Sequence, residues 1–344
     1  MFNFYAPLNN KTSYGLVATN LIENFSQICP SFPIGGQTGV ISKKMAASLL
    51  ANRTFNVDDP CVKLYHQFGM AEFIGKGPHI GLPIFELDQF SDFEKHNLNS
   101  LDGLIVTSKW ASSIAENNTK HSPDVVPLGV DRSIFNEVNY VPKSFVFFSA
   151  GKWEVRKSQD EIVEAFNKAF VPKDNVELWM SFHNPFYPIE FINEKKKLYS
   201  NTKLGAKIKF VGPFETQQDL ARIMRMTSCG VFPSKAEGWG LETLEMMACG
   251  KPVIVTNYAG HTEYCDKTNS ILLPISGLVP AHDNKWFFGQ GNWASFNIDD
   301  LVETMKSSFK LGNRINAWGI ETSKKFSWKN SATILENIIR DKYK

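Results

Sequence analysis

Short apolar runs, rich in β-branched and aromatic residues, alternate with helix-length amphipathic segments along nearly the whole chain. This alternation predicts βαβ units and therefore parallel sheets covered by helices. The first half is expected to hold strands at 2–6, 62–66, 82–86, 103–107 and 125–128, with helices at 14–27, 41–51, 90–97 and 109–116. The second half is expected to hold strands at 145–149, 176–182, 207–211, 230–233, 252–256 and 271–273, with helices at 158–170, 189–199, 217–226 and 241–249. The predicted fold class is α/β, with two doubly wound domains in series.

A length of 344 residues suits two domains of roughly 150–170 residues each better than one core. The stretch NEVNYVPK, residues 136–143, is polar, contains a proline and lies between two patterned regions. We therefore expect one domain over 1–138 and a second over 139–326. Ligands of such folds bind at the carboxyl ends of the parallel strands, so a cleft between the two domains is the expected site.

Composition narrows the setting in which the chain works. The 37 basic and 35 acidic residues leave a formal charge of +2, which does not favour nucleic acid or a membrane as a partner. The start, MFNFYAPLNN, has no signal-peptide pattern, and no apolar run approaches the roughly 20 residues that span a bilayer. The five cysteines are scattered without C-x-x-C pairs, which favours reduced thiols over a metal or disulfide framework. A cytoplasmic location is expected.

The stretch SKAEGWGLETLEMMACGKP places Glu237 and Glu245 eight positions apart around a Gly-Trp-Gly turn. Gly238 and Gly240 remove Cβ atoms there, so the backbone can approach a ligand closely. The helix that begins near Gly240 presents unpaired N–H groups, which suit a phosphate. Carboxylates accept paired hydrogen bonds and match the vicinal hydroxyls of a sugar or ribose. The spacing alone leaves open a plainer interpretation, in which the acids merely favour a helix start and a solvated loop.

A longer segment, FPSKAEGWGLETLEMMACGKPVIVTNYAGHTEY, resembles the E-x7-E region of retaining nucleotide-sugar glycosyltransferases of family 4. The resemblance implies the GT-B fold, two Rossmann-like domains facing across a cleft, with 1–138 on the acceptor side and 139–326 binding the donor. It also implies that residues 327–344 form a helix that crosses back onto the first domain. In that family pattern Glu237 contacts hydroxyls of the donor sugar and Glu245 holds the ribose. The backbone amides of the turn would meet the sugar and diphosphate, at Gly238, Trp239, Gly240 and Leu241.

The segment FFSAGKWEVRKSQDEIVEAF resembles the family's opening of the donor domain, where two cations meet the diphosphate. Carried over residue by residue, these cations are Lys152 and Lys157. Two departures stand out, because Lys152 replaces the usual arginine and Ser158 replaces the usual glycine. Lysine keeps the charge but loses the bidentate geometry of arginine. A solvated basic loop is the alternative interpretation.

Three further features are less specific. LNNKTSYGLVATNLIENF is similar to the family's first loop, in which Gly15 would approach the diphosphate or acceptor and Ser13 would cap the helix. In VKLYHQFGM, His66 closes a predicted strand, where the family often places a histidine near the donor sugar. An ordinary turn and a structural histidine explain both equally simply. Residues 274–296 are too long and aromatic for an ordinary connector, and their aromatics either stack on a ligand or form a satellite core.

The resemblance implies a retaining glycosyltransferase that moves a sugar from a nucleoside diphosphate to an acceptor hydroxyl. No D-x-D-like acidic pair is found, so we expect neither a metal nor a cofactor, and the lysines would offset the charge of the leaving diphosphate. The alternatives are another GT-B enzyme, such as a nucleotide-sugar epimerase, or a non-catalytic nucleotide-sugar-binding protein. The acceptor stays open among a glycan, a lipid-linked sugar, a protein and a modified nucleic acid, and so does peripheral membrane contact.

Overall fold

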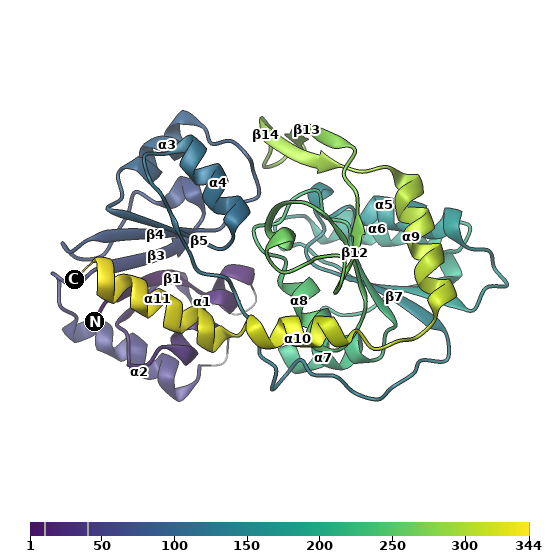
Figure 1. Cartoon of the computed structure of the whole chain (residues 1–344), viewed down its shortest axis with the longest axis horizontal. Coiled ribbons are helices and arrows are strands. Elements are labelled where there is room, and N and C mark those ends of the chain that lie inside the picture. The colour runs from purple at the N-terminus through teal and green to yellow at the C-terminus, as the bar shows by residue number, and fades with distance from the viewer. Residues whose placement is uncertain (10–11, 40, 344) are drawn as a thin grey trace. The chain divides into compact units, whose positions relative to one another are not determined.

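The computed structural model describes residues 1–9, 12–39 and 41–343 (Figure 1). The chain divides into two compact units, each built around a six-stranded parallel sheet with helices. Unit 1 comprises Met1–Gly129 and Phe326–Lys344, and unit 2 comprises Val130–Lys325. The predicted α/β class with two parallel-sheet domains is confirmed.

Unit 1 holds its strands in the order β2-β1-β3-β4-β5-β6, and every neighbouring pair is parallel. These strands are β1 (Asn3–Asn9), β2 (Ser31–Thr38), β3 (Cys61–Tyr65), β4 (His79–Pro83), β5 (Gly103–Val106) and β6 (Asp124–Val125). Its helices are α1 (Ser13–Asn24), α2 (Lys43–Ala51), α3 (Asp92–Asn99), α4 (Lys109–Asn118) and α11 (Trp328–Lys342), with short 3-10 turns η1 (Asn52–Thr54) and η2 (Gln67–Gly69).

Helix α1 lies against both β1 and α11. Its cap is Thr12, whose hydroxyl accepts a hydrogen bond from the Gly15 N–H at 3.2 Å, so the expectation of a Ser13 cap is off by one residue. A Cβ at Gly15 would stand 1.8 Å from the Asn9 carbonyl oxygen, which shows how closely α1 crosses the end of β1. The last helix of the chain, α11, also belongs to unit 1 (Figure 1).

Strand β2 is an element that the sequence pattern did not predict. It reads SFPIGGQT, and its proline and two glycines are residues that strands usually avoid. The strand lies at the edge of the sheet, where only β1 pairs with it. An edge strand tolerates a residue that cannot donate a ladder hydrogen bond, which explains why Pro33 fits opposite Ala6.

Unit 2 holds a second parallel sheet in the order β12-β11-β10-β7-β8-β9. The strands are β7 (Phe145–Ala150), β8 (Val176–Ser181), β9 (Ile208–Phe210), β10 (Cys229–Phe232), β11 (Val253–Thr256) and β12 (Ile271–Leu273). The helices are α5 (Gln159–Ala169), α6 (Ile189–Ser200), α7 (Gln217–Arg225), α8 (Leu241–Ala248), α9 (Ile298–Leu311) and α10 (Ala317–Lys325), with 3-10 turns η3 (Val155–Lys157), η4 (Gly205–Lys207) and η5 (Ala259–Glu263).

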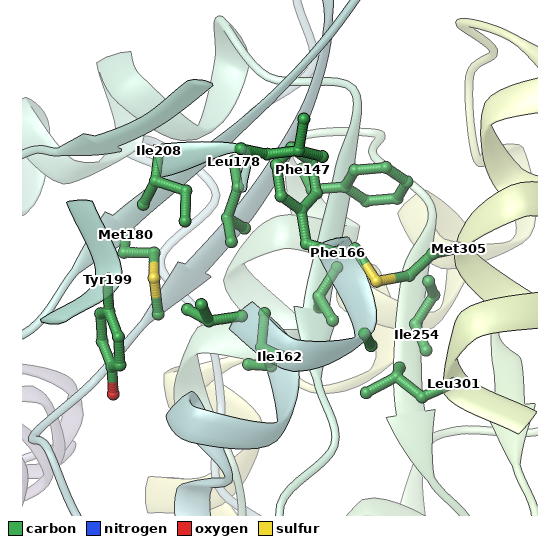
Figure 2. Packing of buried hydrophobic residues seen from close by; sticks show 14 of the residues in the cluster. Phe147, Ile162, Phe166, Leu178, Met180, Tyr199, Ile208, Ile254, Leu301 and Met305 are labelled. Carbon is green, nitrogen blue, oxygen red and sulfur yellow. The ribbon is translucent and has the colours of Figure 1, made fainter. Parts of the chain in front are cut away.

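Strands β7, β10 and β11 are buried along their whole length, as expected for a parallel sheet covered on both faces. Phe147 and Phe166 lie in the core between the sheet and α5, and Met305 of α9 joins them (Figure 2). None of the helices in the described parts of either unit is long and apolar enough to cross a bilayer. This rigid core fixes the loops at the carboxyl ends of its strands.

The two units divide after Gly129, nine residues before the expected boundary at 138. Hydrogen bonds attach the residues between these two positions, 130–138, to the rest of unit 2. The Arg225 guanidinium donates to the carbonyl oxygens of Ile134 and Asn136, the latter at 3.0 Å, and Arg132 donates to Ser323 Oγ at 2.7 Å. Polar composition therefore marked the segment as a connector, whereas its hydrogen bonds make it part of unit 2.

Residues 274–296, expected as a long irregular segment, contain an antiparallel hairpin of β13 (Gly277–His282) and β14 (Phe288–Ser295). Trp293 is buried, and its ring lies 4.9 Å from that of Phe287 in an edge-on contact, which fits a satellite core. Trp286 and Phe288 are exposed. The aromatics of this segment thus divide between packing and the surface.

Candidate active site

The turn between β10 and α8 is the centre of the candidate site. Strand β10 lies inside the sheet between β11 and β7, so its carboxyl end opens where parallel α/β sheets bind ligands. Gly240 caps α8 with φ +88°, and a Cβ there would stand 2.4 Å from His261 Nε2. The Tyr264 hydroxyl holds the turn from behind, 2.7 Å from the Gly240 carbonyl oxygen and 3.0 Å from that of Trp239. The turn requires glycine for both conformation and space.

Glu237 stands in this turn and is buried. Its Oε1 accepts hydrogen bonds from Lys157 Nζ at 2.9 Å and from Ser234 Oγ at 2.8 Å, and its Oε2 lies 3.0 Å from an Arg156 nitrogen. Burial raises the pKa of the Glu237 carboxyl, but the charges of Lys157 and Arg156 outweigh burial and hold the pKa well below its usual range. Glu237 is therefore an ionised carboxylate across the physiological pH range.

The partners of Glu237 come from the loop after β7. Burial lowers the pKa of Lys157, but Glu237 and Glu242 outweigh it, so the pKa lies above its usual value and the amine stays charged. Lys157 Nζ also lies 3.5 Å from Glu242 Oε1. Gly151 makes room for this side chain, because a Cβ there would stand 2.9 Å from Lys157 Cδ. The loop thus delivers a permanent cation to the β10–α8 turn.

Arg156 completes the contact between the two loops. Its guanidinium joins Glu237 to Glu154, at 2.8 Å from Glu154 Oε2, and donates to the Ala236 carbonyl oxygen at 3.0 Å. Lys152 pairs with the other oxygen of Glu154 at 2.9 Å and is partly exposed. Both lysines were expected from the sequence, whereas Arg156 was not. The signal that could have found it is its position directly before Lys157 in the same basic loop.

One pocket in unit 2 opens between these two loops. It is lined by Ser149, Ala150, Lys157, Phe232, Ser234, Glu237, Gly240, Glu242, Thr243 and His261. Burial lowers the pKa of His261 to about 4, although Glu237 works in the opposite direction, so this imidazole is neutral at pH 7. Among the described residues, no group of three or more histidine, cysteine, aspartate or glutamate side chains could hold a metal ion. The charged groups that face the pocket are Lys157, Glu237 and Glu242.

Glu245 lies one turn into α8 and is as buried as Glu237, but its carboxyl group has no charged partner like those of Glu237. It is 5% exposed, and in the described parts of the chain no hydrogen bond or ion pair reaches its carboxyl group. Burial, and then the charge of Glu242, raise the pKa of Glu245 to about 8. The expected pair of carboxylates is therefore one carboxylate, Glu237, and one carboxylic acid, Glu245, at neutral pH. Glu245 is also not among the residues that line the pocket.

The remaining predicted residues fall at separate places. Trp239 is buried beside Tyr264 at 4.9 Å between ring centroids, and Gly238 and Leu241 flank the capped turn. Gly15 and His66 belong to unit 1, where Gly15 is in α1 and His66 directly follows β3. The structure brings Lys157, Glu237 and Gly240 together in one pocket. It adds Ser234 and Glu242, for which no role was predicted.

Residues 142–284 match the family described as Glycosyl transferases group 1. An uncharacterized glycosyltransferase of Methanocaldococcus jannaschii is 28% identical over 243 residues, which cover 69% of this chain and 59% of that protein. A glycosyltransferase from Rickettsia africae superposes with a TM-score of 0.71 at 15% identity, covering 99% of this chain and 98% of that one. HepE of Anabaena, solved in complex with UDP and glucose, gives 0.70 at 12% identity and covers 99% of both chains.

The solved structures agree with the fold of this chain. The chain spans about half the length of the curated relatives that it matches, with 59%, 46% and 42% covered in three of them. The matched segment contains both loops of the pocket, from β7 through α8. Residues 142–284 of unit 2 thus match a group 1 glycosyl transferase domain, and the whole chain has the fold of solved GT-B glycosyltransferases.

Proposed function

We propose that the chain is a retaining glycosyltransferase that moves a sugar from a nucleoside diphosphate to an acceptor hydroxyl. The observation that carries this proposal is the buried Glu237 carboxylate, held by Lys157 and Arg156 beside the amino end of α8. Such a site offers a hydrogen-bond acceptor for sugar hydroxyls next to cations and backbone N–H groups for phosphate. HepE, which shares the fold, was solved with UDP and glucose, and this supports a nucleotide-sugar donor.

Each residue then has a distinct task. Glu237 accepts hydrogen bonds from hydroxyls of the donor sugar and fixes the sugar in the pocket. Lys157 lies 2.9 Å from Glu237 and shares its charge between this carboxylate and the leaving diphosphate. Preorganised charge directed at a developing charge is usually the largest contribution to catalysis. The N–H groups at the start of α8 add positive potential at the same place.

Two further roles follow from the protonation of Glu245 and from the exposure of Lys152. Glu245, protonated at pH 7, both donates and accepts a hydrogen bond, and we assign it to the ribose. Lys152 is the more exposed cation, paired with Glu154 and 5.4 Å from the centroid of the Phe186 ring, and we assign it to a phosphate of the donor. The cations supply the charge that a metal ion supplies in other transferases, and the reaction is proposed to proceed without one.

The test is nucleotide release from the full chain, measured against a panel of UDP-, GDP- and ADP-sugars with simple sugar acceptors. The proposal predicts that one nucleotide class is released, with turnover that depends on the acceptor. A product with the same anomeric configuration as the donor supports retention. Clear binding of a nucleotide sugar without turnover for any donor and acceptor contradicts the enzyme and favours a binding protein.

A further inference from the structure

His66 in unit 1 is half-buried and is held by a series of hydrogen bonds that does not involve the pocket of unit 2. The residue directly follows β3 and begins the short turn η2. Its Nδ1 lies 2.9 Å from Gln67 Oε1. The Phe68 ring stacks on the imidazole at 5.2 Å between centroids, and the Tyr14 ring lies 5.3 Å away. The ring is thus fixed in place by neighbours on two elements.

The chain of hydrogen bonds continues from Gln67 into α3. Gln67 Nε2 donates to Glu94 Oε1 at 2.9 Å, and the two side chains are 4% and 8% exposed. The other oxygen of Glu94 accepts from the Ser91 N–H at 2.7 Å and from the Ser91 hydroxyl at 2.9 Å. Ser91 and Glu94 form the capping box of α3, so the carboxylate is held by helix geometry as well.

The donor-to-acceptor direction of these hydrogen bonds determines which nitrogen of His66 carries its proton. An ionised carboxylate only accepts hydrogen bonds, so the amide of Gln67 must turn its NH₂ group toward Glu94. Its carbonyl oxygen then faces His66, and because that oxygen also only accepts, Nδ1 must carry the hydrogen. The neutral imidazole therefore has its lone pair on Nε2. No hydrogen bond to Nε2 comes from the residues that the structure describes.

We infer that Gln67 and Glu94 are positioning residues that make His66 Nε2 a hydrogen-bond acceptor, suited to a ligand hydroxyl and not to a phosphate. Phosphate oxygens only accept hydrogen bonds, so they find no donor on this face of the neutral ring. A sugar hydroxyl donates to Nε2 directly. The assignment of a sugar as ligand rests on the proposed function, whereas the tautomer of His66 does not.

The substitution Glu94→Gln reverses the donors and acceptors in this series of hydrogen bonds but keeps the bonds themselves. Glutamine serves the capping box as well as glutamate does, so α3 keeps its start. The two Ser91 donors require the amide oxygen of the new side chain, which leaves its NH₂ group facing Gln67. Gln67 must then turn over and present its own NH₂ group to His66. Nδ1 becomes the acceptor, and the hydrogen moves to Nε2.

The tautomer is read from two-bond ¹H–¹⁵N correlation spectra of the full chain at about pH 8, above the usual histidine pKa. The His66 signals are assigned by their loss in His66→Gln. His121 is an internal reference, because its Nε2 lies 3.0 Å from the Leu98 carbonyl oxygen and must carry the hydrogen. Ser91→Ala is the matched control, since it weakens the cap of α3 but leaves the carboxylate to orient Gln67.

We expect the Nδ1–H form in the wild type and in Ser91→Ala, and the Nε2–H form in Glu94→Gln. An Nε2–H wild type, or a Glu94→Gln spectrum unchanged from the wild type, overturns the inference. With an active donor, Glu94→Gln should lower turnover about tenfold or more while Ser91→Ala does not. Full turnover with an inverted tautomer overturns the hydroxyl assignment. A chain inactive with every donor defeats the proposed function, and the spectra still decide the tautomer.

Discussion

Lys157 and Glu237 are 80 residues apart in sequence, yet they form a buried ion pair with 2.9 Å between Nζ and Oε1. The pair joins the loop after β7 to the turn after β10, and β7 and β10 are neighbours in the sheet. Both charges persist at neutral pH because each offsets the burial cost of the other. The pair therefore places a positive and a negative charge side by side in the lining of the pocket.

Replacing Lys157 by glutamine should reduce turnover by about a hundredfold or more, because a single donor to a developing charge is worth that much in other enzymes. Arg156 and Ser234 still bind Glu237, so most of the protein stays folded. Turnover is measured per folded molecule, with folding checked by thermal melting. Lys235→Gln is the control, since Lys235 pairs with Glu161 at 2.7 Å outside the pocket lining. Equal losses in both variants would contradict a specific role for Lys157.

Substituting Gly240 by alanine should destabilise the chain by about 3 kcal/mol, since left-handed strain adds to a clash with a buried ring. The added Cβ would stand 2.4 Å from His261 Nε2. Gly289→Ala is the control for strain alone, because Gly289 has φ +91° and open space around its Cβ position. Thermal melts of the two variants separate the cost of backbone strain from the cost of the clash. A loss of stability in Gly240→Ala no larger than that in Gly289→Ala would contradict the close contact between Gly240 and His261.

Ser158→Gly should stabilise the protein. Ser158 has φ +58° at the start of α5, a left-handed conformation that costs a non-glycine residue about 1–2 kcal/mol. Its buried hydroxyl has no hydrogen-bond partner in the described structure, so nothing is lost with the side chain. A gain of about 1 kcal/mol corresponds to a melting temperature about 2–4 °C higher. Ser158→Ala keeps the strained backbone and should gain less, and an equal gain would refute the backbone explanation.

Glu245 should make stability depend on pH. Its pKa is raised in the folded chain to about 8, above the value near 4.3 of an unfolded glutamate. The folded state therefore holds a proton that the unfolded state releases, and this stabilisation is complete below about pH 4 and is lost as pH rises toward 8. The loss approaches about 1.4 kcal/mol per pH unit.

Glu245→Gln cannot ionise and serves as the comparison for that dependence. Its melting temperature should rise relative to the wild type as the pH goes from 5.5 to 8. Parallel curves for the two proteins across this range would show that Glu245 is ionised in the folded chain. In that case both Glu237 and Glu245 would be ionised carboxylates at neutral pH.

Much of the site followed from local sequence, and the exceptions have physical causes. The turn at Gly240 was predictable because glycine pattern, strand end and helix start lie within a few residues of one another. The contact of Arg156 with Glu237 was not, because it depends on which strands are neighbours. Glu245 was expected to be ionised, but burial determines its protonation and burial is a property of the packed helix.

The fold shows the same division between local pattern and tertiary context. Most strands and helices were recognisable from the period of their apolar residues. Strand β2 was missed because its proline and glycines argue against a strand, and only pairing with β1 at the sheet edge stabilises it. The boundary at Gly129 was not predicted, because the residues that follow it are attached to unit 2 by the hydrogen bonds of Arg225 and Arg132. Composition does not show these hydrogen bonds.

The role proposed for Glu237 is tested most directly by nucleotide release from the wild type and from Glu237→Gln, measured with the donor that the panel selects. Glutamine fits the space of Glu237 but carries no charge, and it still offers an oxygen to Lys157 and Ser234. We expect turnover in the wild type and a loss of about a hundredfold or more in the variant, with the melting temperature showing a folded protein in both. Unchanged turnover in Glu237→Gln would contradict the assignment of this pocket as the place where the donor sugar is held.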